Sequence, residues 1–599
     1  MSKVGFARRW GSMVVISAFC WGMSQPVRAQ DLVTTEDITS GSSCFVFRDS
    51  RKKPQATAGG GYVGVNKKSS VHRKNNSALA LLAQKRRNEA IAKRKAAAAA
   101  ADRKLAMSNM LTAKAEGFLD NGQTDLAISN YRDALVQYPR NTRASEGLSN
   151  ALTSKGIDVA GENNNEAAIP LFEEAVKVDK RNDVAFAKLG AIYDDKNDNP
   201  KTISNYEAAI ALNSAMTSLY APLGLAYLDS GDVAKAEVNA KKAEAAGVDT
   251  ADAHYLRGMI AFKQNQNDQA IASFDKSLAL DPSLASAEYY RGQAFDRMNK
   301  ADDAVAAYKH AVDIDPSYTQ AEFALGVTSY NKGDYNNALV AYQDVVKAEP
   351  KNYQAHANLA STLRQLERYA DANAEYKIAS EGIKTADLYN EWGYCLGKTA
   401  EWDKSVARLQ TANEISPDAI DNSNVGWAYY NQANSQSQAK NDDAAKASYQ
   451  QATVYSEKAT QQDPKLDAAY LNLGSSHNAL GEYQLAVTAL NTAVGLHSNW
   501  GIALNQLGVG YRGLKDFTNA IATFNQVVSL DGNSKLGLFN LGEAYYASGD
   551  KKNAKKINDR LKKIDPLLGT RLDNILSGKV VIDNATDKIK SKIPKIPFP

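Results

Sequence analysis

Apolar and polar residues recur along most of this chain in two alternating patterns, and both have helical spacing. In the first pattern, alanine is followed by an aromatic residue four positions later, a small or apolar residue three later and proline five later. One such set is Ala270, Phe274, Ser277 and Pro282, and the same spacing begins at Ala127, Ala304 and Ala338. Residues three, four and seven apart share one helix face, so the pattern predicts a short helix with a single apolar stripe.

The second pattern is a Leu-Gly pair followed by tyrosine three residues later. It begins at Leu189, Leu223, Leu507 and Leu541. Glycine lets two helices approach closely, while the aromatic residue fills the space beside them. Proline ends the second helix, and Gly-Asp pairs such as Gly231-Asp232 and Gly549-Asp550 predict the turn between paired helices. One helix pair cannot bury its stripe alone, so neighbouring pairs must stack.

Together the two patterns repeat with a period of about 34 residues. In this the sequence resembles the tetratricopeptide repeat family, and counting phases gives about thirteen units from roughly Ser108 to Pro566. The resemblance implies an all-α fold, a right-handed superhelical solenoid of about thirteen helix-turn-helix units. Members of the family are mostly binding scaffolds with unrelated partners, so the resemblance does not name a ligand.

The repeat phase slips at two places. The first slip, of seven residues, lies between Leu148 and Ala168, and the second, of about thirteen, lies between Gly426 and Pro464. The added residues are polar and rich in Asn, Gln and Ala. They predict lengthened or looped helix ends that project into solvent.

The N-terminus has the pattern of a bacterial signal peptide. Lys3, Arg8 and Arg9 precede a mainly apolar stretch at 10–23, and Val27-Arg28-Ala29 offers small residues for cleavage before position 30. We therefore expect a periplasmic or secreted protein. The alternative is membrane anchoring through an uncleaved N-terminal signal.

The expected organisation follows from these patterns and from the composition of the two ends. It comprises a signal peptide (1–29), a flexible basic tail (30–76), a basic Ala-rich helix (77–107), the solenoid (108–566), a capping helix (567–577) and a Lys/Pro-rich C-terminal tail (578–599). The basic helix either runs into the first repeat or pairs as a short coiled coil.

Charge is segregated along the chain. The whole sequence carries +4, but residues 48–104 carry +13, residues 551–599 carry +8 and residues 105–550 carry −18. The basic tails could bind an anionic membrane surface, or they could only keep an acidic superhelix soluble. Nucleic acid is not expected as a partner of an exported protein.

The sequence offers little support for catalysis. Gly508 to Gly513 match G-x-G-x-x-G, but that motif needs a preceding strand, whereas these glycines fall inside a repeat helix. No two histidines have metal-binding spacing, so we expect no enzyme, no metal site and no cofactor. After the signal only Cys44 and Cys395 remain; Cys44 is either an unpaired thiol or pairs between chains.

The family resemblance also implies where a ligand would bind. The first helix of each unit lines a concave groove, and its second, fifth, ninth and twelfth residues point inward. Carried over, these positions hold Tyr255, Met259, Phe262, Tyr289, Phe323, Tyr330, Arg364, Tyr394, Arg512, Phe539 and Tyr546. Aromatic rings flanked by arginines suit an extended peptide; the alternative is that several of these residues are partly buried packing residues.

Some members of the family hold a peptide carboxylate with a clamp of lysine and asparagine. Asn358, Asn472 and Asn540 occupy one asparagine position, but the accompanying lysines are missing. Because the three asparagines do not lie in consecutive units, we expect no asparagine ladder.

The hypothesis from the sequence is a non-enzymatic scaffold. It would bind extended or helical segments of other proteins in the groove, in an exported or envelope assembly. The alternative is a surface protein that recognises glycans or peptidoglycan through its tyrosines and its Asn/Gln-rich projections.

Overall fold

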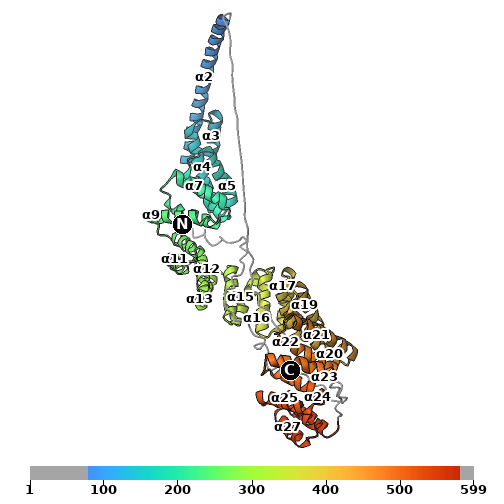
Figure 1. Cartoon of the computed structure of the whole chain (residues 1–599). Coiled ribbons are helices and arrows are strands. Elements are labelled where there is room, and N and C mark those ends of the chain that lie inside the picture. The colour runs from blue at the N-terminus through green and yellow to red at the C-terminus, as the bar shows by residue number, and fades with distance from the viewer. Residues whose placement is uncertain (1–78, 580–599) are drawn as a thin grey trace. The chain divides into compact units, whose positions relative to one another are not determined.

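The computed structural model describes residues 79–579, and these are almost entirely α-helical, with no strand among them (Figure 1). They form two compact units: the first ends at Ala321, and the second begins at Glu322, inside α14 (Thr319–Asn331). The predicted signal peptide at 1–29, the basic tail at 30–76 with Cys44, and residues 580–599 lie outside the described residues.

The helices of the first unit are α2 (Leu79–Asp120), α3 (Thr124–Gln137), α4 (Thr142–Gly161), α5 (Asn165–Val178), α6 (Asp183–Asp195), α7 (Asn199–Leu212), the short 3-10 helix η2 (Thr217–Leu219), α8 (Tyr220–Asp229), α9 (Val233–Ala245), α10 (Ala251–Lys263), α11 (Asn267–Leu280), α12 (Ala285–Arg297) and α13 (Ala301–Ile314).

Those of the second unit, after α14, are α15 (Tyr335–Ala348), α16 (Tyr353–Gln365), α17 (Tyr369–Gly382), α18 (Ala386–Lys398), α19 (Trp402–Ile415), α20 (Ala419–Gln438), α21 (Asp442–Gln462), α22 (Asp467–Leu480), α23 (Tyr483–Leu496), α24 (Gly501–Gly513), α25 (Phe517–Leu530), α26 (Lys535–Ala547), α27 (Lys551–Ile564) and α28 (Pro566–Leu576).

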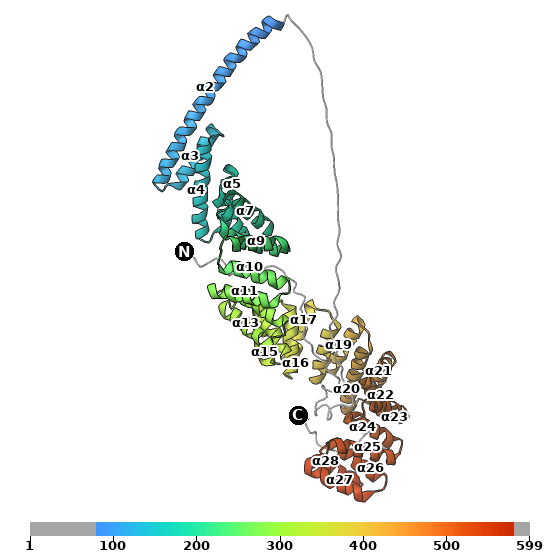
Figure 2. The ribbon, with the colours of Figure 1, turned by 60° about the vertical axis from the view of Figure 1, so that its left-hand side comes forward.

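These helices form hairpins that follow one another in chain order (Figure 2). Within residues 79–579 there are thirteen pairs, from α2 with α3 to α26 with α27, and α28 follows the last pair. The predicted all-α repeat fold and the number of units are confirmed. In each pair we refer to the even-numbered helix as the first helix and to its partner as the second helix.

In several pairs a glycine of the first helix meets a buried aromatic ring of the second helix. A Cβ atom added to Gly258 of α10 would lie 2.5 Å from the ring of Phe274 in α11, and one added to Gly508 of α24 would lie 2.5 Å from Phe524 in α25. Both rings are fully buried. The predicted role of the Leu-Gly pair, close helix approach with an aromatic filler, is therefore confirmed at Gly190, which meets Tyr206, and at Gly508. At Gly224 and Gly542 the neighbouring side chain is a leucine.

The turn within a pair places one residue in the left-handed region, and in several pairs the next residue caps the second helix with a carboxylate. Gly231 and Gly549 have φ values of +83° and +90°. The next residues, Asp232 and Asp550, accept hydrogen bonds from the backbone N–H of Lys235 and Asn553, both at 3.0 Å. The Gly-Asp pairs thus mark the turns as predicted.

Both predicted lengthenings are present as extra helical turns. Most first helices have 13 residues, whereas α4 has 20, α20 has 20, and α21 has 21 where its counterparts have 14. The extended ends of α20 and α21 pack on each other through polar side chains. Tyr449 donates to Asn434 at 2.6 Å, and Ser448 donates to Gln436 at 2.8 Å.

The two ends of the described chain are helical. Helix α2 runs without a break from the basic Ala-rich segment into the first pair, and residues 91–107 are exposed on every side. At the other end α28 packs against α26 and α27 and buries Leu572 and Ile575. It therefore packs on the last helix pair of the described residues.

Candidate peptide-binding face

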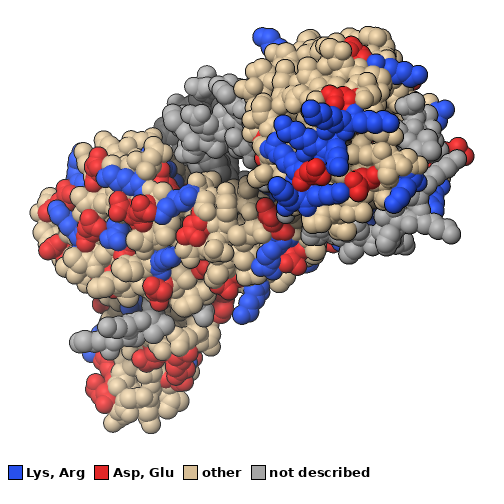
Figure 3. Space-filling view, turned by 90° about the horizontal axis from the view of Figure 1, so that it is seen from below, with Lys and Arg blue, Asp and Glu red and all other residues tan. Residues whose placement is uncertain are grey.

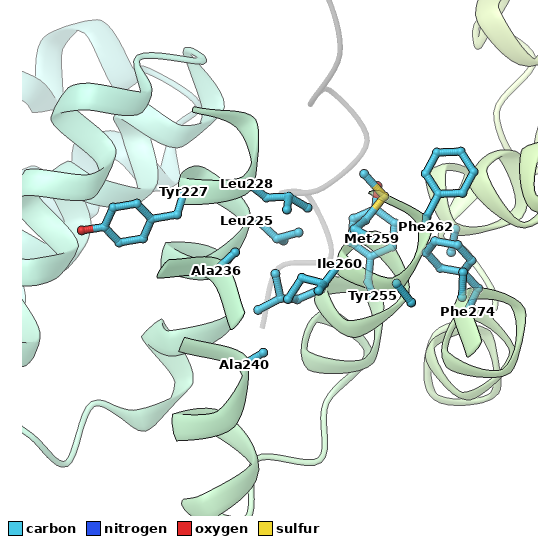
Figure 4. Close-up of a cluster of buried hydrophobic side chains, with 14 of the residues drawn as sticks. Leu225, Tyr227, Leu228, Ala236, Ala240, Tyr255, Met259, Ile260, Phe262 and Phe274 are labelled. Atoms are coloured by element: carbon cyan, nitrogen blue, oxygen red, sulfur yellow. The ribbon is translucent and has the colours of Figure 1, made fainter. Parts of the chain in front are cut away.

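Four residues that the sequence places in the groove lie inside the core of the first unit. Tyr255, Met259 and Phe262 of α10 and Tyr289 of α12 are between 1% and 6% exposed. Figure 4 shows the first three among the buried side chains of one hydrophobic cluster. Their interpretation as ligand-contacting residues does not fit this burial, because little of their surface is left for a partner.

The burial of these side chains comes from their neighbours. Tyr290 of α12 covers Phe262 of α10 at a ring-centroid distance of 5.6 Å, and it lies 6.4 Å from Tyr255. Tyr289 in turn lies 5.1 Å from Tyr318. Burial raises the pKa of Tyr289 to about 12, because its ionised form would have to lose its hydration.

Two further predicted groove residues are buried in the second unit. Phe539 of α26 is 7% exposed, and the guanidinium of Arg571 in α28 lies 5.3 Å from its ring centroid. Arg364 of α16 is 9% exposed. These two side chains are also packing residues.

Five predicted groove residues keep part of their surface exposed. They are Phe323, Tyr330, Tyr394, Arg512 and Tyr546. Three of them belong to the two first helices on either side of α16: Phe323 and Tyr330 lie in α14, and Tyr394 lies in α18. We call these three residues the aromatic strip.

The rings of the aromatic strip are fixed by neighbouring side chains. Gln365 of α16 donates to the hydroxyl of Tyr330 at 3.3 Å. Tyr394 stacks on Trp427 of α20, with centroids 6.0 Å apart and an interplanar angle of 24°. Rings that are already ordered lose little conformational entropy when a partner binds, which favours them as contact residues.

A largely buried ion pair connects α16 and α18. The guanidinium of Arg364 lies 3.6 Å from the carboxylate of Glu391 in α18, which also accepts hydrogen bonds from Ser361 and Tyr376, both at 2.6 Å. Burial opposes the charge of Arg364, but Glu391, Tyr376 and Tyr330 outweigh it and raise the Arg364 pKa. Arg364 therefore already has a carboxylate partner within the protein.

The other predicted arginine is also engaged. Arg512 of α24 forms an ion pair with Glu543 of α26, and both side chains are largely buried. This pair links two successive first helices. Neither arginine is arranged as a free anchor for a peptide carboxylate.

A line of polar side chains that sequence reasoning missed runs along the second unit. It consists of the sixth residue of each first helix from α16 to α26. These six residues are Asn358, Glu391, Asn424, Asn472, Gln506 and Asn540. In α10, α12 and α14 the same position holds Leu256, Tyr290 and Ala324. We call these six residues the amide line.

The amide line links neighbouring first helices by hydrogen bonds. Asn472 donates to the hydroxyl of Ser423 at 3.2 Å and to its backbone oxygen at 3.1 Å. Asn540 donates to Asn505 at 2.9 Å. The three asparagines that the sequence singled out lie in α16, α22 and α26, which are not consecutive first helices, as expected. The amide line is instead a mixed series that includes Glu391 and Gln506, and its side chains are bonded to the protein itself.

Two features account for the missed line. In α18 the position holds glutamate, so the asparagines do not form an unbroken series. The longer α20 and α21 also shift the spacing between Asn424 and Asn472 to 48 residues. The recurrence of a polar residue at the sixth position becomes visible when each residue is counted from the start of its own helix.

The described residues show where potential metal ligands and the glycine motif lie. No group of three or more His, Cys, Asp or Glu side chains among them could hold a metal ion. Gly508 and Gly510 of the G-x-G-x-x-G match lie inside α24, as predicted. No helix in the described part of the chain is both long and apolar enough to span a bilayer.

Comparison with known families finds the tetratricopeptide repeat along most of the described chain. Four models with this description match residues 112–160, 251–284, 289–346, 323–382, 467–499, 502–534 and 537–567. No curated protein matches the sequence.

Many solved structures are similar to parts of the chain. They include Pseudomonas aeruginosa pilF, with 18% identity, a TM-score of 0.30 and coverage of 35% of this chain and 95% of the other. The complex Cut9-Hcn1 has 14% identity, a TM-score of 0.34 and coverage of 78% and 96%. YrrB, described as a TPR protein with an unusual peptide-binding site, has 21% identity, a TM-score of 0.25 and coverage of 31% and 95%. At these TM-scores the likeness says nothing about what this chain binds.

Proposed function

Because this chain is a tetratricopeptide repeat protein, we propose that it is a non-enzymatic scaffold that binds an extended or helical segment of another protein on the first helices of its second unit. The aromatic strip is the observation that carries the proposal. It offers three partly exposed and ordered rings on α14 and α18.

The rings would supply most of the contact area with the bound segment. The polar side chains between them would fix how that segment is aligned along the helices. Tyrosine combines an apolar face with a hydroxyl, so it can pack against a side chain and hydrogen-bond to a peptide backbone. The exposed Gln365 lies between Tyr330 and the helix that carries Tyr394. A segment crossing α14, α16 and α18 would meet these groups in turn.

The test is a crosslinking pull-down with the full chain and a double variant, Tyr330→Ala with Tyr394→Ala. The matched control is Tyr138→Ala with Tyr455→Ala, which also removes two partly exposed tyrosines but leaves the strip intact. We expect a discrete protein that the full chain and the control capture and that the strip variant loses, at equal helicity.

Two outcomes would contradict this proposal. Equal capture by all three proteins would place binding outside the aromatic strip. Capture of envelope polysaccharide by the full chain, with no discrete protein, would favour the alternative of a glycan- or peptidoglycan-recognising protein.

We also propose that this binding occurs in the periplasm or outside the cell, within an envelope assembly. The support is the charged, apolar and small-residue pattern of residues 1–29. Mass spectrometry of the protein from its native host should give a chain that begins at position 30. A full-length, membrane-bound chain would instead show an uncleaved anchor. Membrane contact through the basic tails stays a prediction.

A further inference from the structure

One face of α27 carries six basic side chains. Its residues Lys551, Lys552, Lys555, Lys556, Arg560 and Lys563 recur at the spacing of one helix face, and all six are exposed. The same face includes one acid, Asp559. We call the six residues the basic stripe. Figure 3 views the molecule from the end where α27 lies in Figure 1 and shows Lys and Arg side chains gathered in one patch.

The positive charge of the basic stripe is only partly balanced by nearby acids, which are Asp550 beside Lys552 and Asp559 on the stripe's own face. Among the ion pairs of the described residues, none involves the six side chains, although Arg560 donates to the backbone oxygen of Gly532. Lys562, beside the stripe, is paired with Asp573 at 3.1 Å. The stripe therefore presents six charges along a length of about 18 Å, the rise of twelve helical steps.

The stripe is a particular property of α27 and not of second helices in general. The two preceding second helices, α23 and α25, contain no lysine or arginine. On its opposite face α27 buries Ala554, Asn558 and Leu561 in the contact with its neighbours. Packing therefore explains which residues lie on the buried face of α27, but it does not explain why the exposed face is basic.

We propose that the basic stripe docks this protein onto the surface of an anionic lipid bilayer. Five of the six residues are lysines, whose compact charges attract a diffuse anionic surface, whereas arginine is the residue that matches a single phosphate bidentately. No apolar side chain interrupts the stripe, so the helix rests on the headgroups and does not insert. Each lysine near such a surface contributes separately to binding.

The shape of this end also favours a broad surface as the partner. Helix α27 packs against both α26 and α28, so it does not project as an isolated rod. A helix that reads the major groove of DNA has to enter a space about 12 Å wide, and single strands bind to exposed aromatic platforms. The stripe contains no aromatic residue, which makes nucleic acid the less suitable partner.

The sequence beyond the described residues has matching composition. Residues 580–599 add four lysines, at positions 588, 590, 592 and 595, interleaved with Ile, Pro and Phe. Lysines in this segment would add to the attraction of an anionic bilayer. The sequence alone suggested the basic tails as the membrane contact, whereas the structure adds a folded surface.

The test is co-sedimentation of the full chain with vesicles of 75% phosphatidylcholine and 25% phosphatidylglycerol, compared with pure phosphatidylcholine. The stripe variant combines K551Q, K555Q, K556Q and R560Q. The control variant combines K276Q, K309Q, K347Q and K446Q, four exposed lysines on other second helices. The two variants have the same net charge, and both spare buried residues.

We expect the full chain and the control to bind the anionic vesicles and not the neutral ones. At about a five-fold loss per charge, removing four charges should make the stripe variant bind them roughly 600-fold more weakly. Raising the salt from 0.1 to 0.5 M should also abolish binding, because exposed charges are screened. Equal losses in the two variants would overturn the proposal, since they would show that net charge alone is responsible.

A truncated chain and a DNA ligand test whether the binding comes from residues 580–599 or is a preference for nucleic acid. A chain that ends at Lys579 keeps the stripe and lacks residues 580–599, and it should still bind anionic vesicles. Loss of binding in this truncated chain, with the stripe variant unaffected, would assign the contact to the tail and overturn the proposal. Binding of a DNA duplex by a chain that fails to bind vesicles would overturn it as well.

Discussion

Single glycines in the first helices fix how closely each helix pair can approach. At Gly258 the glycine Cα faces the ring of Phe274, so a methyl group there would overlap the ring at 2.5 Å. We expect Gly258→Ala to destabilise the first unit by about 1–3 kcal/mol through overpacking. Urea unfolding followed by far-ultraviolet circular dichroism would measure this loss.

An exposed glycine provides the control for this substitution. Gly117 lies near the end of α2, and no atom lies within 4 Å of the place where its Cβ would be. Gly117→Ala should leave stability unchanged or raise it by up to about 1 kcal/mol, because alanine is the better helix former. Equal destabilisation by both substitutions would show that packing against Phe274 is not the cause.

The buried tyrosines of the first unit should make it sensitive to alkaline pH. Burial raises the pKa of Tyr289 to about 12, while an unfolded tyrosine ionises near 10. Between these values the unfolded chain has lost its proton and the folded chain has not. Stability that is fully present below pH 10 is therefore lost as the pH rises toward 12.

This prediction is tested by following tyrosinate absorbance and helicity together between pH 9 and 12. In the full chain the late-ionising tyrosines should titrate only as helicity is lost. Tyr289→Phe should move the alkaline loss of helicity to higher pH, in part only, because burial also raises the pKa of Tyr290, Tyr308 and Tyr318. Ionisation of every tyrosine near pH 10 with intact helices would contradict the expectation.

The sequence predicted the helix faces but not which groove residues are exposed. Spacing within one helix shows which side chains share a face. It does not show what the next helix places beside them. Tyr255 and Phe262 are covered because α12 carries the large ring of Tyr290, whereas Tyr330 faces the smaller and partly solvated Gln365. The exposure of a groove residue therefore depends on the side chain that the neighbouring first helix places beside it.

At the level of helices, the amide line distinguishes the second unit from the first. From α16 onward each first helix carries a polar side chain at its sixth residue, and several of these side chains bond to the preceding first helix. In α10 and α12 the same position is filled by Leu256 and Tyr290. The contacts between first helices thus change from apolar packing to buried hydrogen bonds.

Removing one of these amides should loosen the contact between two particular helices. Asn472→Ala takes away the donor that bridges α22 to Ser423 of α20, where both groups are buried. An acceptor left unsatisfied costs about 1–3 kcal/mol. Hydrogen exchange should show faster opening of α20 and α22, with α10 and α12 unchanged.

The comparison for this variant is an asparagine on the solvent side of a helix. Asn130 of α3 is partly exposed and donates to the backbone oxygen of Leu126, one turn earlier. Asn130→Ala should change stability by less than about 0.5 kcal/mol. If Asn472→Ala reduced stability by no more than this, water would have to satisfy the acceptors that Asn472 leaves. The role of the amide line in joining helices would then be refuted.

For the whole molecule, repetition determines how local changes are transmitted. Each helix pair packs mainly on the pairs before and after it in the chain. Stability is then close to a sum of unit terms and nearest-neighbour terms, and a long array need not unfold in one step. A change in one unit should affect the other only if their contacts are energetically coupled.

A double variant measures this coupling. Gly258→Ala lies in the first unit and Asn472→Ala in the second, and the two residues share no partner among the described contacts. We expect their effects on the free energy of unfolding to add within about 0.5 kcal/mol, with each substitution moving its own part of the urea transition. A single cooperative transition that both substitutions shift equally would show that the two units unfold as one. In that case a ligand bound to the aromatic strip would stabilise the first unit as well, because binding to the folded state alone stabilises everything that unfolds with it.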